Sequence, residues 1–288
     1  MYDLQYVKKR RRRRIAALVC MFSSIGVASL VVISFLGRTV GSFTVALKNT
    51  TVKLALSEDE EFTHPTSYLR IDDIPSNYYE FSYKWFDRIG LEHVDDAKND
   101  RYFGMSSDGT GMYYLKYTFF VKNVGNTNAK YDMYINLDES TKADNGKTLD
   151  ESLRIMVFEN DPSVADSHEK DVYAQDLHDY RYTVIDKSGK QTYQAFISDT
   201  PQPTSEGKVY EDDDHPLAES FLTGKGSTII HKSQIDFNKN EIMRYTIVYW
   251  LEGEASFPEY DEQGNAKDPK GAKIKLSVNI NAAEYTIK

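Results

Sequence analysis

Residues that could do chemistry are sparse in this chain, and the densest group is acidic. Glu211-Asp212-Asp213-Asp214-His215 brings four carboxylates and an imidazole into five consecutive residues. Hard oxygen ligands at this density are suited to Ca²⁺, although neither this segment nor Asp261–Asn265 has the ligand spacing of an EF-hand loop. A charge run of this kind is also typical of a solvated loop. We therefore predict an acidic loop at 211–215 and keep Ca²⁺ binding as an alternative.

A second candidate is aromatic. Tyr79, Phe81, Tyr83 and Trp85 occupy every second position. Because side chains alternate across a strand, a strand at this place would put all four rings on one face. Such a face either packs into the core or stacks on the sugar rings of a glycan. We expect the core role, with a glycan-binding platform as the alternative.

Signatures of catalysis are missing from the sequence. It contains neither a Gly-x-Ser-x-Gly elbow nor a His-Glu-x-x-His motif. The single cysteine, Cys20, lies in an apolar segment. The six histidines show no i,i+2 or i,i+4 pairing and stand at His64, His93, His168, His178, His215 and His231. The sequence therefore predicts no catalytic residue, no metal site and no cofactor, and it favours a protein that is not an enzyme.

The N-terminal segment predicts the membrane topology of the protein. Seven consecutive basic residues, Lys8–Arg14, precede 22 uncharged residues, Ile15–Leu36. At 1.5 Å per residue, a helix of that length spans about 33 Å, close to the hydrocarbon thickness of a bilayer. The excess of positive charge on the N-terminal side predicts a cytoplasmic tail over 1–14, a transmembrane signal-anchor helix over 15–37 and an extracytoplasmic domain over 38–288.

Two fates of this segment are open. Its apolar core is longer than the 7–15 residues of a secretory signal, which favours a retained anchor. Val40-Gly41-Ser42 and Thr44-Val45-Ala46 nevertheless offer small residues to a signal peptidase. We predict a retained anchor, and a cleaved, secreted matrix subunit is the alternative.

The charge balance changes when the N-terminal segment is set aside. Residues 1–38 hold eight of the 35 basic residues and one of the 44 acidic ones, so residues 39–288 carry 27 basic and 43 acidic residues, net −16. A domain with this charge is soluble and is a poor ligand for nucleic acid. It has no cysteine and must be stabilised by its core instead of disulfides. These features fit a bacterial cell surface.

The dominant period of residues 38–288 is two, which predicts half-buried strands. Apolar and polar residues alternate over 113–121, 131–137 and 274–280. Two further runs, Leu153–Phe158 and Tyr245–Leu251, are apolar on nearly both sides and are expected to be central strands. The predicted fold class is all-β, an antiparallel two-sheet sandwich of Ig-like or jelly-roll type, preceded by one transmembrane α-helix.

Connecting segments complete the predicted layout. Turn chemistry predicts hairpin turns at Val124–Thr127, Asp144–Lys147 and Asp186–Gly189. Short helical turns are expected at Thr148–Glu151, which resembles a capping box, and at Pro216–Leu222. Polar insertions are expected near 159–215 and 252–270.

The chain resembles Firmicutes surface proteins of the TasA/camelysin type. The resemblance rests on the basic run, the long apolar segment, the stretch Gly41–Leu47 that leads into strands, and the stretch Tyr117–Asp132. It implies export, a jelly-roll sandwich and, for some members, assembly into matrix fibres. It implies no catalytic residue.

These observations lead us to expect a single-pass, membrane-anchored bacterial cell-surface protein. Its non-catalytic extracellular domain would serve adhesion, matrix assembly or envelope scaffolding. An extracytoplasmic ligand-recognition module that binds glycan or Ca²⁺ is the alternative. The expected partners are the membrane, through residues 15–37, and either a second copy of the chain or a surface protein or glycan, but not nucleic acid.

Overall fold

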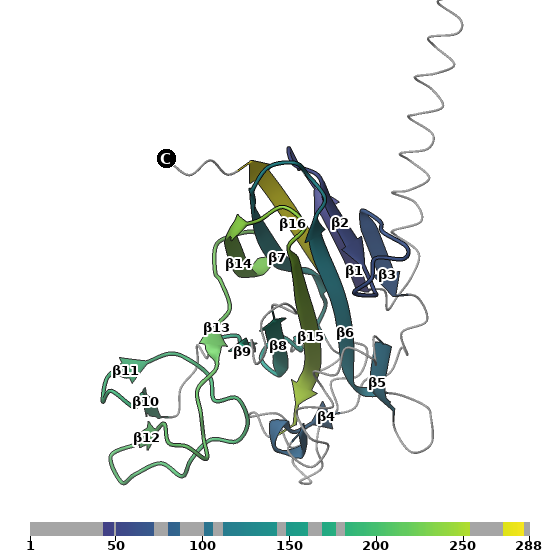
Figure 1. The fold of residues 1–288 in the computed structure, drawn as a ribbon. Coiled ribbons are helices and arrows are strands. Elements are labelled where there is room, and N and C mark those ends of the chain that lie inside the picture. Colours follow the sequence, from purple (N-terminus) through teal and green to yellow (C-terminus); the bar gives the residue numbers. More distant parts are fainter. Residues whose placement is uncertain are drawn as a thin grey trace, which may run out of the picture. The chain divides into compact units, whose positions relative to one another are not determined.

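Alternation of apolar and polar residues produces strands throughout the described part of the chain (Figure 1). The structure is a computed structural model, which describes residues 43–48, 50–71, 80–86, 101–105, 112–142, 148–160, 169–176, 182–253 and 273–284. Within these ranges the chain forms sixteen strands and one 3₁₀ helix, η1 (Tyr83–Trp85). The predicted all-β class is confirmed.

The strands form three sheets within one compact unit, Gly41–Lys288. The five-stranded sheet has the order β14 (Thr228–Phe237), β7 (Ala129–Ser140), β16 (Ile274–Glu284), β1 (Phe43–Lys48), β3 (Tyr68–Ile71). The eight-stranded sheet has the order β13 (Glu219–Ser220), β9 (Glu169–Ala174), β8 (Leu153–Asn160), β15 (Ile242–Glu252), β6 (Met112–Asn123), β2 (Leu54–Ser57), with β4 (Glu80–Phe81) paired to β15 and β5 (Arg101–Met105) paired to β6. The three-stranded sheet has the order β11 (Gln191–Thr192), β10 (Thr183–Ile185), β12 (Lys208–Tyr210).

The five-stranded and eight-stranded sheets share the main core. Tyr117 of β6 and Ile247 of β15 are fully buried in the same apolar cluster as Ile135 of β7 and Val278 of β16. These residues occupy alternate positions along their strands, so each sheet turns one face toward the other. The arrangement is sandwich-like, and each fully buried aliphatic side chain in it contributes about 1.5–3 kcal/mol.

The eight-stranded sheet is covered on its second face as well. Trp250, Met156 and Phe158 point away from the main core and are fully buried in a second cluster. Phe81 and Phe86 are also members of this cluster. Because β8 and β15 are covered on both faces, their sequences are apolar on both sides. The prediction that these two runs are central strands is confirmed.

Pairing of the strands differs from the prediction in two respects. The pairs β1–β16, β4–β15, β9–β13 and β10–β12 are parallel, so the sheets are mixed and the antiparallel prediction is correct only in part. The turn at Val124–Thr127 does not close a hairpin, because β6 and β7 lie in different sheets.

A buried asparagine explains the failed hairpin. The side chain of Asn123, fully buried, donates to the carbonyls of Thr127 and Phe237, 3.0 Å in each case, and accepts the N–H of Gly125 at 3.0 Å. These bonds hold the chain as it crosses from one sheet to the other. A Cβ at Gly125 would lie 3.1 Å from the Asn123 side-chain oxygen, which favours glycine at this position.

Other turn predictions have mixed outcomes. The hairpin turn at Asp186–Gly189 is confirmed, with Gly189 at φ +83° joining β10 and β11. Thr148–Glu151 leads into a single turn, closed by the N–H of Leu153 on the Leu149 carbonyl, and not into a helix. Pro216–Leu222 is extended and contains β13, so the helical prediction there is wrong.

Several predicted features lie outside the described residues. They are the segments 1–14 and 15–37, Tyr79, the Asp144–Lys147 turn and most of the 252–270 insertion. Across the described ranges, no helix has the length and apolar character needed to cross a bilayer.

A buried tyrosine pair in the main core leads to a pH prediction. The hydroxyls of Tyr131 and Tyr245 lie 2.7 Å apart, and burial raises the pKa of both phenols. In the unfolded chain these phenols ionise near pH 10. Stability from the pair is therefore complete below about pH 10 and falls as the pH rises further. Tyr245→Phe should flatten this alkaline decline and cost about 1 kcal/mol at pH 8, since Tyr131 loses its partner.

Urea unfolding between pH 8 and 11.5 measures both effects. Tyr193→Phe, at a ring that is 60% exposed, is the matched control and should keep the wild-type decline. An equally steep decline in Tyr245→Phe would contradict the assignment.

Candidate functional site

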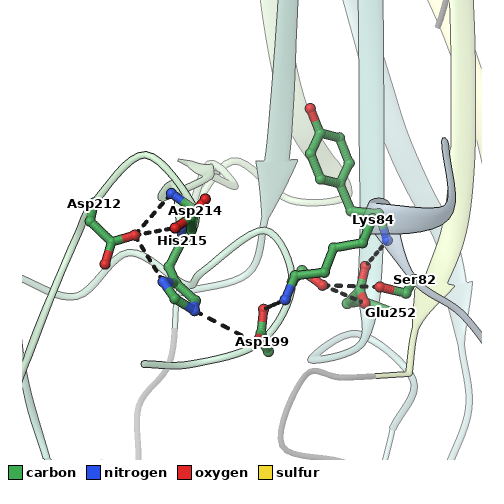
Figure 2. Close-up of polar contacts among 9 residues, drawn as sticks. Ser82, Lys84, Asp199, Asp212, Asp214, His215 and Glu252 are labelled. Atoms are coloured by element: carbon green, nitrogen blue, oxygen red, sulfur yellow. Dashed lines mark hydrogen bonds and ion pairs between the residues drawn. The ribbon is translucent and has the colours of Figure 1, made fainter. Parts of the chain in front are cut away.

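Glu252, at the end of β15, is the centre of a buried polar cluster that joins three segments (Figure 2). Its carboxylate is fully buried and accepts hydrogen bonds from the backbone N–H of Tyr83 at 2.8 Å and the indole N–H of Trp250 at 2.9 Å. The hydroxyl of Ser198 donates to its other oxygen at 3.2 Å, and Ser82 lies 3.1 Å from Ser198. Three donors stabilise the anionic form of this carboxylate.

Arg154 provides the positive charge beside this cluster. It lies on β8 opposite Trp250 and is 1% exposed. Its guanidinium donates to the carbonyls of Glu151, Leu153, Phe196 and Ile197 at 2.8–3.1 Å. Burial lowers the pKa of Arg154 to about 10, opposed by the charge of Glu252, so it remains a cation at neutral pH.

A series of contacts among charged residues and His215 lies near the buried cluster (Figure 2). Lys84 pairs with Asp199 at 2.6 Å, and Asp199 lies 3.6 Å from Nε2 of His215. Nδ1 of His215 lies 2.8 Å from Asp212. These side-chain contacts link η1, the 198–200 segment and the acidic loop, so they hold together segments that are distant in sequence.

The predicted acidic loop at 211–215 is present, and most of its carboxylates bind donors of this chain. Glu211 accepts the N–H groups of Lys187 and Leu217, and Asp213 pairs with the ammonium of Lys187 at 2.7 Å. Asp212 accepts the N–H groups of Asp214 and His215. The carboxylates do not converge on one point, and the described residues contain no cluster of three or more metal-ligating side chains.

The predicted aromatic face at 79–85 is not formed. The strand ends at Phe81, and Trp85 N–H bonds to the Ser82 carbonyl at 2.9 Å, which starts the 3₁₀ turn. The turn breaks the alternation, so Phe81 is buried, Tyr83 is half-buried and Trp85 is 42% exposed. Phe86 takes the core position instead. Tyr79 lies outside the described residues.

A histidine, an aspartate and a serine also meet on β7 and β14 of the five-stranded sheet. Nε2 of His231 lies 2.9 Å from Asp132, and the hydroxyl of Ser233 bonds to the same aspartate. The ring of Tyr134 stacks on His231 at 4.8 Å. In a hydrolytic triad the serine and the aspartate contact different imidazole nitrogens. Here Ser233 and Asp132 both face Nε2, so the arrangement lacks that relay.

His215 likewise lacks a nucleophile beside it. Among the described residues its ring nitrogens contact Asp199 and Asp212, and no hydroxyl lies within hydrogen-bonding distance. Ser82 and Ser198 bond to each other and to Glu252 instead. The geometry of the polar cluster is suited to holding segments together.

Replacing His215 by alanine tests the contact between His215 and Asp212. The hydrogen bond from the imidazole is the main reason that the pKa of Asp212 lies below its ordinary value. The stabilisation from Asp212 is therefore present above about pH 3.9 and is lost as the pH falls through the lowered pKa. We expect His215→Ala to raise the Asp212 pKa toward the ordinary value, measured by NMR titration of the carboxyl carbon. Asp186, whose pKa is lowered mainly by Ser188, should not move.

The buried cluster was not predicted from the sequence. Its members are Ser82, Arg154, Ser198 and Glu252. The signal was nevertheless available, because Arg154 and Glu252 are charged residues in or next to the two most apolar runs of the chain. A charge at such a place is buried and needs a partner. The histidines His93, His168 and His178 lie outside the described residues, and His64 is exposed.

Comparison with known proteins identifies no relative. No protein-family model matches this chain, and no match is found among the curated proteins or the solved structures.

Proposed function

We propose that this chain is a single-pass, membrane-anchored protein of a bacterial cell surface, whose extracytoplasmic domain acts by contact. The N-terminal basic run and the apolar segment at 15–37 support the anchor and the N-in orientation. The absence of cysteine from residues 38–288 fits this setting. The proposal includes the fold: the five-stranded and eight-stranded sheets form a sandwich of Ig-like or jelly-roll type.

The placement of aromatic side chains carries the contact role. Most of the aromatic side chains in the described ranges are buried. Trp85, Tyr193 and Tyr210 are exceptions, since they are 42%, 60% and 47% exposed. Tyrosine and tryptophan are enriched where proteins make contacts, because they combine a large apolar area with a polar group. The polar side chains that could do chemistry are used instead to hold segments of the fold together. Adhesion, matrix assembly and envelope scaffolding all use such contacts.

Fractionation of expressing cells tests the proposal. The full chain with a C-terminal epitope tag should be found in the membrane fraction of a Gram-positive host, and protease added to intact cells should remove the tag. The intact mass of the exported form separates a retained anchor from a cleaved, secreted subunit. A tag that remains protected in the cytosolic fraction would contradict the proposal. A variant with Lys8–Arg14 replaced by serine should lose the N-in preference.

A second candidate is an extracytoplasmic module that recognises a glycan. The exposed tyrosines of the three-stranded sheet favour it over a Ca²⁺ module, because the carboxylates at 211–213 already have donors within the chain.

A further inference from the structure

β1 is the first strand of the described chain, and it is an inner strand of the five-stranded sheet (Figure 1). On one side it is parallel to β16 over five residue pairs, from Thr44 beside Ser277 to Lys48 beside Asn281. On the other side it is antiparallel to β3 over four residue pairs. The strand that lies nearest in sequence to the proposed anchor is therefore held along both edges.

Tension on an anchored domain enters this strand. Only residues 38–42 separate the apolar segment at 15–37 from Phe43, so a pull between the membrane and a partner is transmitted along the chain into the start of β1. When the tension leaves at Glu284, the end of β16, the two parallel strands are pulled in opposite directions along a shared axis. They have to slide past each other, so the hydrogen bonds between them resist together and not one after another.

Buried side chains of β1 oppose the same sliding motion. Phe43 and Val45 are 1% and 0% exposed. The ring of Phe43 packs on two tyrosines of the eight-stranded sheet, with centroids 5.7 Å from Tyr117 and 6.1 Å from Tyr249. Movement of β1 along its axis would take Phe43 away from both rings and expose apolar surface. The resistance therefore includes packing across the sandwich as well as strand pairing.

The pairing with β1 is the shorter of the two attachments of β16. β16 pairs with β7 over eleven residue pairs and with β1 over five. Tension between Phe43 and Glu284 therefore separates β1 from β16 before it separates β16 from β7. The force needed to unfold the domain along this direction is set by the β1–β16 pair.

We propose that the β1–β16 pair is a mechanical clamp, a pair of strands that resists tension along its axis and keeps the domain folded while the anchor and a partner are pulled apart. The inference rests on the proposed function, because the anchor is what directs tension into β1. It adds resistance to force to that function, since a protein that attaches a cell to another surface is placed under tension.

Force measurements on single molecules of the full chain in detergent test the proposal, with two directions of pulling. The chain carries a tag at each end and the substitutions Cys20→Ser and Lys130→Cys. Pulling on the two tags shears β1 against β16. Pulling on the C-terminal tag and on residue 130, which is exposed and pairs with Ala283, separates β7 from β16 at one end, so their bonds break one at a time. We expect the unfolding force to be about 3-fold or more higher in the first direction.

Ala46→Pro locates the resistance within the sheet. The N–H of Leu47 bonds to the Ser67 carbonyl at 3.0 Å, on the β3 side of β1, so by alternation the N–H of Ala46 points to β16. Proline removes this N–H, and the side chain lies on the face away from the main core, in which Val45 is buried. We expect the variant to lower the unfolding force about 2-fold in the first direction and by less in the second.

Two outcomes would overturn the proposal. One is an equal unfolding force in the two directions, and the other is a proline variant that weakens both directions by the same factor, as a general loss of stability would. If circular dichroism shows that the proline variant does not fold, the comparison of the two directions decides alone. These readouts use purified chain, so they are separate from the cell fractionation that tests the proposed location.

Discussion

Replacing Glu252 by alanine should produce one of the two largest losses of stability, about 3–5 kcal/mol, because the substitution removes the buried acceptor of three hydrogen bonds. The indole N–H of Trp250, the N–H of Tyr83 and the hydroxyl of Ser198 would each lose this acceptor in a site with little access to water. The bond from the Tyr83 N–H joins η1 to the end of β15. We therefore expect the 82–86 segment to open first.

Urea unfolding followed by tryptophan fluorescence measures this loss. Trp250 is fully buried and Trp85 is exposed, so a red shift of the emission reports mainly on Trp250. Glu219→Ala, at an exposed glutamate of β13, is the control and should leave the midpoint unchanged. A Glu252→Ala variant that unfolds at the wild-type midpoint would contradict the role given to this carboxylate.

Replacing Arg154 by methionine should cost a similar amount, about 3–5 kcal/mol, since four backbone carbonyls lose a charged donor in the interior. Methionine has a similar length but cannot donate, so the two bonds to the Phe196 and Ile197 carbonyls that hold this segment on the sheet are lost. Arg154→Lys should also be strongly destabilising, because an ammonium cannot reproduce the fork of N–H donors.

The double variant Arg154→Met with Glu252→Gln separates charge pairing from hydrogen bonding. Compared with the single variants Arg154→Met and Glu252→Gln, the double variant should be more stable than the sum of the two losses predicts, by about 0.5–3 kcal/mol, because the charge of Glu252 acts on Arg154. Strict additivity in the unfolding free energies would show that the two side chains act independently.

The strands were predictable where burial determines the pattern. β7 and β16 have one face in the core, so their sequences alternate. β6 differs, because its polar side is buried as well, with Lys116 and Thr118 fully buried, and the prediction of a half-buried strand at 113–121 is wrong there. β8 and β15 are covered on both faces and are apolar throughout. These patterns are local consequences of the environment on each side of a strand, and they can be read without knowledge of the strand's neighbours.

Short helical signals failed because they are weak on their own. A helix of one or two turns is unfavourable in isolation, since nucleation is costly. At Pro216–Leu222, the N–H of Ala218 bonds to the Ala195 carbonyl and the N–H of Phe221 bonds to the Ala174 carbonyl. These partners are distant in sequence, and the extended conformation follows from them.

The candidate sites could be predicted only in part, because they too depend on contacts between residues that are distant in sequence. The acidic loop at 211–215 was correctly placed, because consecutive charges stay in solvent wherever the chain runs. The prediction of an aromatic face at 79–85 was wrong, because the strand ends in a turn at which the Glu252 carboxylate accepts the N–H of Tyr83.

The sequence by itself determined the all-β class, the central strands and the acidity of residues 39–288, because these depend on composition and on periodicity within single segments. It also supplies the basic and apolar N-terminal run on which the proposed location rests. Only the tertiary structure decided which strands pair, that the chain crosses between sheets at Asn123, and that Arg154 and Glu252 are brought together in the interior. Pairing and burial of charge depend on contacts between distant segments, and a local pattern contains no record of those contacts.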